Sequence, residues 1–424
     1  MRPKILGSNS LRRWRDGKAA RPKNGRPLQN QLPQTENGFV EASASRALRD
    51  GEGMPLFKLS HHRILMGIVL MAGLCCAAIC ASAQQNAWVS SVPPKEGDFV
   101  TRDFKFSDGQ SLPEVRLHYT TIGTPQRDAN GRVTNAVVIL HGTNRAGRVF
   151  LVPSFAGVLF GPGQLLDASK FYLILPDQLG AGLGKSTKPS DGLRAKFPHY
   201  DYSDMVRASQ LLLAQGLQVN HLHLLVGASM GCMEGFMWGE SNPGDVDAML
   251  LLSCLPVEVA SRNRMVRKIM VDDIRMDPGW KNGNYTAQPY GLRAALGHLL
   301  VVGSVPTFWQ KEYPTAALAD KYVDQYIEEN MKTTDANDFM YQYDASRNFD
   351  ASKDLGKITA KVLLINPQED FWNPAELGIA EHEIKKVKNG TFVLLPFSES
   401  RGHYTFFQAA LWQKHFGEFF EGLK

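Results

Sequence analysis

The chain has 424 residues, of which 43% are hydrophobic and 21% charged, as in globular proteins large enough to bury a substantial core. Residues 1–83 hold 13 of the 47 Lys and Arg and 5 of the 42 Asp and Glu. Residues 84–424, with 34 and 37, therefore carry a net charge of −3. The part expected to fold lacks the basic surplus of nucleic-acid-binding proteins, and we expect no nucleic-acid partner.

The region 54–83 has the pattern of an export signal. Basic Lys58 and Arg63 precede an apolar run over 64–80, and three small residues that end at Ala83 follow as a cleavage site. We therefore predict a signal peptide that is cleaved after Ala83 and an exported protein, periplasmic or secreted. An uncleaved membrane anchor is the alternative, because the apolar run is about as long as the shortest membrane spans.

Residues 1–53 stand before this signal, although a signal peptide normally starts at the initiator Met. Met54 would make a conventional start, so we predict that 1–53 is a misassigned extension or a disordered one. The segment is rich in Arg, Pro, Asn and Gly and has no hydrophobic periodicity, as disordered segments do. A genuine basic tail is the alternative.

Along 84–424, short apolar segments alternate with helical stretches, which is typical of a mostly parallel central sheet flanked by helices. The alternation stops between 255 and 356, where no strand is indicated and 313–331 is a helix candidate. We therefore predict a helical lid over 256–356, inserted between two core parts, 84–255 and 357–424. Outside the lid, the predicted strands cover 115–123, 136–140, 171–175, 248–253, 361–365 and 391–395, and the predicted helices cover 201–216 and 404–420.

The segment Gly227-Ala228-Ser229-Met230-Gly231 ends an apolar run and leads into helix-compatible sequence. This is the pattern of a nucleophile elbow, a sharp strand-to-helix turn that lifts a serine hydroxyl out of the backbone. Gly227 and Gly231 fit the turn, because a Cβ at either position would collide with the neighbouring strand or helix. We predict Ser229 as the nucleophile.

A serine hydroxyl needs a base within hydrogen-bond reach and a carboxylate that orients this base. After an elbow, the acid comes next along the chain and the histidine last. Asp370 follows the strand predicted at 361–365, and His403 follows the one at 391–395. We predict Asp370 as the orienting acid and His403 as the general base. Glu369 is the alternative acid, because adjacent residues point in different directions.

Acyl transfer also needs N–H donors for the negative charge that develops on the carbonyl oxygen. Met230, directly after the nucleophile, is predicted to supply one of them, and Thr143 or Gly142 the other. No metal site is indicated, because His-Glu-x-x-His and cysteine pairs at ligand spacing are missing. The glycines over 180–184 are not followed by a Gly-Lys-Ser/Thr ending at the spacing of a phosphate-binding loop, so we expect no cofactor.

Two cysteines, Cys232 and Cys254, follow the predicted signal peptide. Export would permit a disulfide between them. Both follow predicted core strands, however, and cysteine is often a small buried residue. We expect two buried thiols rather than a disulfide.

Several segments occur in the order known from one enzyme family: Leu-Gly-Ala-Gly-Leu-Gly-Lys-Ser-Thr at 179–187, Phe-Pro-His-Tyr at 197–200, the elbow at 227–233, and Asp-Pro-Gly-Trp-Lys-Asn-Gly-Asn-Tyr at 277–285. Together they resemble the homoserine O-acetyltransferase branch of the α/β-hydrolase superfamily. The resemblance covers most of 84–424 and implies an α/β-hydrolase fold with an inserted helical lid. By analogy it also implies a homodimer that pairs through the lid.

Two positions depart from the pattern of this family. Its acetyltransferases typically carry an Asp directly after the catalytic His, suited to the homoserine amino group, where this chain has Tyr404. They also carry an Arg six residues before the Asp-Pro pair, suited to the substrate carboxylate. This chain has Val271 there, with Arg267 and Arg275 nearby. Loss of both charged contacts would leave a zwitterionic amino acid unrecognised.

The predicted compartment bears on the acyl donor, since acetyl-CoA is a cytoplasmic metabolite that an exported enzyme would lack. We therefore predict an exported serine hydrolase that cleaves a small ester or acyl substrate through Ser229, Asp370 and His403, with an acyl-enzyme intermediate. An acyltransferase of the homoserine O-acetyltransferase type is the first alternative. A non-catalytic binding protein on the same fold is the second.

Overall fold

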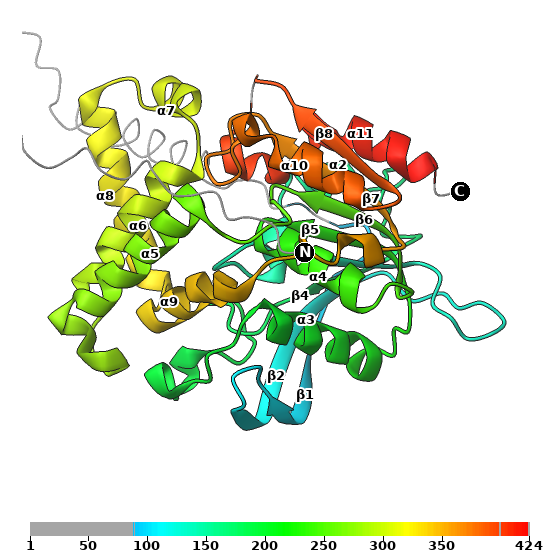
Figure 1. The fold of residues 1–424 in the computed structure, drawn as a ribbon, viewed down its shortest axis with the longest axis horizontal. Helices are drawn as coiled ribbons and strands as arrows, with labels where there is room; N and C mark the ends of the chain where they lie inside the picture. The colour runs from blue at the N-terminus through cyan, green and yellow to red at the C-terminus, as the bar shows by residue number, and fades with distance from the viewer. Residues whose placement is uncertain (1–87, 89, 398–399, 423–424) are drawn as a thin grey trace, which may run out of the picture. The chain divides into compact units, whose positions relative to one another are not determined.

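The computed structural model describes residues 88, 90–397 and 400–422 (Figure 1). The predicted extension over 1–53, the predicted signal peptide over 54–83 and its cleavage site lie outside the described residues.

An eight-stranded sheet has the strand order β1-β2-β4-β3-β5-β6-β7-β8. β2 pairs antiparallel with β1 and with β4, and all the remaining neighbours are parallel, which confirms the prediction of a mostly parallel sheet. The strands are β1 (Lys95–Lys105), β2 (Ser111–Ile122), β3 (Ala136–Leu140), β4 (Tyr172–Pro176), β5 (Leu222–Ala228), β6 (Val246–Leu252), β7 (Lys361–Pro367) and β8 (Gly390–Leu395).

The central strands are apolar along their whole length because both faces of the sheet are covered. In β3, Val138 packs into the hydrophobic core on one face and Val137 into the core on the other, since successive side chains of a strand point to opposite faces. Edge strand β1 is different. Of its residues only Thr101 and Phe104 are buried, so the strand is largely polar and has no apolar run by which the sequence would predict it.

Helices cover both faces of the sheet. α3 (Tyr202–Leu211) and α4 (Met230–Ser241) contribute buried residues to one core, and α2 (Ala156–Leu159) and α11 (Ala409–Glu421) contribute to the other. A short helix, α10 (Ile379–Glu383), lies between β7 and β8. The helix predicted over 201–216 starts after its N-cap, Asp201, which accepts hydrogen bonds from two backbone N–H groups, and it ends in a π-helical turn.

Five helices lie between β6 and β7, and we call them the helical insertion: α5 (Ser261–Met276), α6 (Tyr290–Gly303), α7 (Pro306–Glu312), α8 (Ala316–Thr333) and α9 (Ala336–Asp344). α6 packs against α5 and α8, and α5 packs against α9, beside the sheet at the left of Figure 1. The helix predicted over 313–331 begins only at Ala316, because Thr315 accepts the N–H of Leu318 as its N-cap.

Within the described residues, no single helix is long and apolar enough to cross a membrane. Helices α6 and α7 meet the criteria of length and composition together, but they are bent by 101° where they join.

Candidate active site

Ser229 stands at the sharp turn between β5 and α4, where the sequence predicts the elbow. Its φ of 55° is a left-handed conformation that non-glycine residues rarely adopt. The flanking glycines are required by close backbone contacts. A Cβ on Gly227 would lie 2.2 Å from the carbonyl oxygen of Gly231, and one on Gly231 would lie 2.3 Å from that of Leu140. The turn therefore depends on these two residues.

His403 lies directly beside Ser229. It belongs to a 3₁₀ turn, Gly402–Phe407, that follows β8, so the helix predicted over 404–420 is split into this turn and α11. The Nε2 atom of His403 is 2.8 Å from Ser229 Oγ, and its Nδ1 atom is 2.8 Å from Oδ2 of Asp370. Because a carboxylate only accepts hydrogen bonds, Nδ1 carries the proton and Nε2 is left to accept from the serine hydroxyl.

Asp370 is held in place by its own loop after β7. Its Oδ1 accepts the backbone N–H groups of Trp372 and Asn373, at 2.8 and 3.2 Å, and its Oδ2 accepts the Asn373 side-chain amide at 2.9 Å. Both carboxylate oxygens of Glu369 lack a hydrogen-bond partner among the described residues. Of the two candidate acids, the structure therefore brings Asp370 to His403.

The loop predicted to complete an oxyanion hole follows β3 and lies against the elbow. A Cβ on Gly142 would lie 3.3 Å from Ser229 Cβ, and the His141 carbonyl accepts the N–H of Gly231 at 3.1 Å. Met230 is the first residue of α4, so its N–H has no acceptor within the helix. Of the predicted donors, Gly142 and Thr143 line the same cavity as Ser229, and Met230 directly follows Ser229 in the chain.

His141 itself has a positioning role that the sequence does not reveal. It is fully buried, and burial lowers the pKa of its imidazole, which favours the neutral form. Its Nδ1 donates to the Gly142 carbonyl at 2.8 Å, and its Nε2 accepts the backbone N–H of Gln178 at 3.1 Å. Both ring nitrogens are therefore used to hold the loop beside Ser229.

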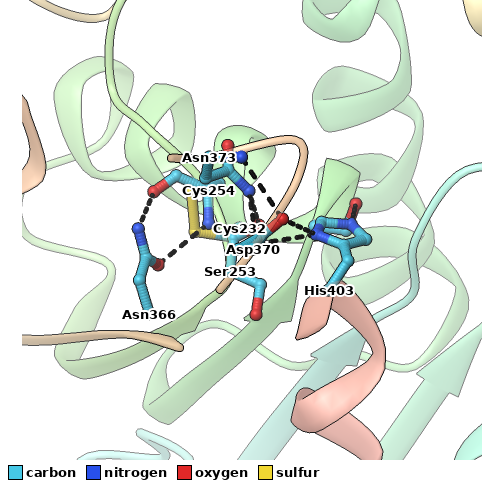
Figure 2. The surroundings of a disulfide bond; sticks show 8 residues. Cys232, Ser253, Cys254, Asn366, Asp370, Asn373 and His403 are labelled. Carbon is cyan, nitrogen blue, oxygen red and sulfur yellow. Dashed lines mark hydrogen bonds and ion pairs between the residues drawn. A yellow bond between two sulfur atoms is a disulfide. The ribbon is translucent and has the colours of Figure 1, made fainter. Parts of the chain in front are cut away.

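Cys232 and Cys254 form a disulfide, so the expectation of two free thiols is wrong (Figure 2). Both residues are fully buried, as expected, but the elbow brings the first turn of α4 against the loop after β6. The side-chain amide of Asn366 in β7 accepts a hydrogen bond from the backbone N–H of Cys254 and donates one to the Cys254 carbonyl. Figure 2 shows Asp370 and His403 beside this cross-link, which therefore joins the helix that follows Ser229 to the surroundings of the acid.

A cavity opens in front of Ser229 and His403, with walls from the core and from the helical insertion. Tyr404 lines it, with its ring centroid 6.2 Å from that of His403. Val271 is buried and does not line the cavity. Arg267, one turn earlier on α5, does line it, and so does Arg145 from the loop after β3. The complete lining is Gly142, Thr143, Asn144, Arg145, Leu183, Ser229, Met233, Asn263, Arg267, Leu299, Tyr326, Asn330, Tyr343, Trp372, Asn373, His403, Tyr404 and Phe406.

Among the described residues, no group of three or more His, Cys, Asp or Glu is placed to hold a metal ion.

Some polar residues at the site were not indicated by any sequence motif. Asn373, for example, donates from one amide to Asp370 and to the Ser253 carbonyl. Its loop position gives no sequence signal for this role.

The parallel sheet, the elbow and the inserted helices together define an enzyme of the α/β-hydrolase superfamily, a group that includes acyltransferases and esterases. The family model described as "alpha/beta hydrolase fold" matches residues 135–379, more than half of the chain. The chain belongs to this family.

Known proteins similar to this chain include homoserine O-acetyltransferases and esterases. The homoserine O-acetyltransferase of Methanobrevibacter ruminantium is 26% identical over 318 residues, which cover 65% of this chain and 63% of that relative. This chain thus spans slightly less than two thirds of that protein's length. The solved structure of esterase E22 has a TM-score of 0.68 at 20% identity and covers 77% of this chain and 100% of its own. Homoserine O-acetyltransferase from Bacillus anthracis has a TM-score of 0.68 at 22% identity and covers 77% and 97%. The two structures support the shared fold.

Proposed function

We propose that this protein transfers an acyl group to a hydroxyl acceptor through an acyl-enzyme on Ser229, in the manner of a homoserine O-acetyltransferase. The observation that carries the proposal is the hydrogen-bonded series from Ser229 Oγ to His403 Nε2 and from His403 Nδ1 to Asp370, each at 2.8 Å. This is the arrangement that makes a serine hydroxyl nucleophilic near neutral pH.

In the first half-reaction, His403 takes the hydroxyl proton as Ser229 Oγ attacks the acyl carbonyl. The N–H groups of Met230 and of Gly142 or Thr143 would stabilise the negative oxygen of the tetrahedral intermediate. His403 then protonates the leaving group, and the acyl group stays on Ser229. In the second half-reaction, His403 deprotonates the acceptor hydroxyl, which attacks the acyl-enzyme. His403 then returns the proton to Ser229 Oγ as the bond between this oxygen and the acyl carbon breaks. Asp370 stabilises the protonated imidazole in both steps.

Transfer to an alcohol is favoured by the curated relatives, which carry the name homoserine O-acetyltransferase. It is also favoured by Arg267. The sequence suggests that the family's arginine is lost at Val271, but Arg267 supplies a guanidinium to the cavity from one turn earlier on the same helix. A positive group is thereby available for the carboxylate of an acceptor.

Hydrolysis is the second candidate, and it rests on different observations. Tyr404 offers no counter-charge for the amino group of homoserine. The buried disulfide and the predicted signal peptide both favour an exported protein, periplasmic or secreted, where acetyl-CoA is lacking. With water in place of the alcohol, the same residues would act as an esterase.

One experiment separates the two candidates. Purified protein is incubated with acetyl-CoA, with and without homoserine or 4-hydroxybutanoate, and free CoA is followed, while p-nitrophenyl acetate hydrolysis is measured in parallel. Release of CoA that depends on the alcohol supports the transferase, whereas ester cleavage without such release supports the esterase. A fluorophosphonate probe that labels the protein but not Ser229→Ala would rule out a non-catalytic binding protein. Failure to label the wild-type protein would overturn both enzymatic proposals.

A further inference from the structure

The Lys, Arg, Asp and Glu residues that line the cavity in front of Ser229 are all positively charged. Arg145 and Arg267 line it, and none of its lining residues in the described part of the chain is an Asp or Glu. Asp370, the carboxylate that acts on the reacting residues, lies behind His403 and accepts a hydrogen bond from it. The cavity therefore has two guanidinium groups and no anion in its wall to balance them.

Arg267 is a buried cation without a charged partner. Its side chain is only 3% exposed, and its Nε donates to the neutral Oδ1 of Asn263 at 2.8 Å. The guanidinium lies 5.5 Å from the ring centroid of Tyr343 and 5.4 Å from that of Trp372. Its Nη1 is buried and makes no hydrogen bond of normal geometry among the described residues, although the guanidinium approaches the hydroxyl of Tyr202. Burial of a charge in this state is unfavourable unless something else completes its contacts.

Glu234 is a buried carboxyl group in the same region, but it does not act as an internal counter-ion for Arg267. Glu234 of α4 and Arg267 both act on the pKa of Tyr202, so the two groups lie in the same buried region. Burial raises the pKa of Glu234 well above its usual range, which favours the neutral carboxyl. Neither of its oxygens has a hydrogen-bond partner among the described residues. The positive charge of Arg267 is thus left for a ligand.

The side of the cavity next to His403 disfavours a cation. Tyr404 occupies the position after the histidine, its ring lies against Gly303 of α6, and the guanidinium of Arg145 is 5.8 Å from the ring centroid. A substrate ammonium at this place would meet an aromatic ring and a positive charge rather than a carboxylate. Like charges in a poorly hydrated cavity repel each other strongly.

We propose that the substrate of this site carries a carboxylate and no ammonium group, and that Arg267 binds this carboxylate. The substrate class is an ester of a hydroxy acid, or a half-ester of a dicarboxylic acid, rather than an amino acid. This inference rests on the acyl-transfer function proposed above and names its substrate class. A planar guanidinium that lines the cavity suits a carboxylate, because the two groups can share parallel hydrogen bonds.

The test compares esters that differ only in charge. In the first set the charge is on the alcohol side of the ester: 4-acetoxybutanoate is anionic, 4-acetoxybutanamide is its neutral isostere, and O-acetyl-L-homoserine adds an ammonium group. In the second set the charge is on the acyl side: monomethyl succinate is anionic, and methyl succinamate is its neutral isostere. Hydroxylamine serves as acceptor and the hydroxamate is measured, so that turnover does not depend on whether water or an alcohol is the natural acceptor. We expect kcat/KM of one anionic ester to exceed that of its neutral isostere and that of O-acetyl-L-homoserine by about 10- to 100-fold, the usual range for a charge-assisted hydrogen bond. The pair that shows the effect tells which side of the ester carries the carboxylate.

Variants assign the preference to Arg267. Arg267→Gln is expected to abolish the preference, so that kcat/KM of the anionic ester falls to that of its neutral isostere in the same variant. Arg267→Lys, which keeps the charge but loses the planar fork, is expected to retain part of the preference. Lys268→Gln, at an exposed neighbour on α5 that pairs with Asp272, is the matched control and should leave the preference unchanged. If Arg267→Gln does not fold, the lysine variant and the wild-type comparison still decide.

The outcomes also separate this inference from the proposed function. Wild-type protein that uses the neutral isostere or O-acetyl-L-homoserine as well as the anionic ester overturns the inference alone. The same holds for an anion preference that survives in Arg267→Gln. Absence of hydroxamate from every ester, together with no fluorophosphonate labelling of Ser229, overturns both.

Discussion

Two adjacent carboxylates follow β7, and they differ in their surroundings. Asp370 accepts hydrogen bonds from Trp372, Asn373 and His403, whereas the oxygens of Glu369 have no partner among the described residues. Asp370→Asn removes the charge that keeps the imidazole in the required tautomer, so we expect kcat for p-nitrophenyl acetate to fall by about 10³- to 10⁴-fold. Glu369→Gln is the matched control and should change kcat only a few-fold. An equal loss in both variants would contradict the assignment.

The residue after His403 provides a second test at this scale. Tyr404→Asp would place a carboxylate beside the cavity and give a substrate ammonium its counter-ion. We expect kcat/KM for O-acetyl-L-homoserine, relative to 4-acetoxybutanamide, to rise by about tenfold, as for one charge-assisted hydrogen bond. Tyr404→Phe removes only the hydroxyl and should leave the ratio low. If the ratio does not rise in the aspartate variant, Tyr404 does not exclude the ammonium.

How far the site can be predicted depends on whether a residue's role is local. Ser229 is recognisable because the strained turn demands glycines at fixed spacing, and His403 because it follows the last strand. The choice between Glu369 and Asp370 depends on the path of one loop, which a sequence does not show. Arg267 reaches the cavity only because apolar residues of α5 pack into the hydrophobic core on one face of the sheet, so no local pattern marks it.

At the scale of elements, the packing of α6 on α5 rests on one glycine. A Cβ on Gly291 would lie 2.1 Å from the backbone oxygen of Asp273, so Gly291→Ala must push the two helices apart. We expect a loss of roughly 1–3 kcal/mol in stability, the usual cost of overpacking. Gly297, on the same helix, has open space around its Cβ position, and Gly297→Ala should stabilise by about 0.5–1 kcal/mol through helix propensity. Thermal unfolding measures both. A variant pair that shifts in the same direction would contradict this packing.

The elements themselves are predictable where burial enforces a pattern. The central strands are apolar on both faces, and the predicted limits of β3, β4, β6 and β7 agree with the structure to within two residues. β2 begins at Ser111, four residues before its predicted start. β1 is missing from the prediction because an edge strand that faces solvent keeps few apolar residues. The helix predicted over 313–331 includes the break between α7 and α8. Tyr313 is the C-cap of α7, and Thr315 is the N-cap with which α8 starts. The prediction missed this break because the aromatic residues continue from α7 into α8.

At the scale of the whole molecule, the homodimer through the lid stays a prediction. The helical insertion leaves apolar side chains exposed on two neighbouring helices: Met265, Ile269 and Met276 on α5, and Val301 on α6. Met265 and Ile269 lie one turn apart on the same face of α5, and exposed apolar side chains that gather on one face can mark a protein–protein interface. We expect Met265→Glu combined with Ile269→Glu to convert a dimer to a monomer in analytical ultracentrifugation. A wild-type protein that sediments as a monomer would contradict the dimer.

The disulfide joins α4, the helix that follows the nucleophile, to the loop after β6. In this loop, the Ser253 carbonyl accepts a hydrogen bond from Asn373, and Asn373 also donates to Asp370. The cross-link closes a segment of 22 residues, for which the loss of chain entropy in the unfolded state corresponds to about 3 kcal/mol. We expect the double variant Cys232→Ala/Cys254→Ala to lose about this much stability and to melt several degrees lower. A phosphine reductant should destabilise the wild-type protein by the same amount and leave the variant unchanged. Equal melting temperatures for the variant and the oxidised wild-type protein would show that the cross-link adds no stability. Because the bond persists only in oxidising surroundings, its presence in protein isolated under alkylating conditions would also support export.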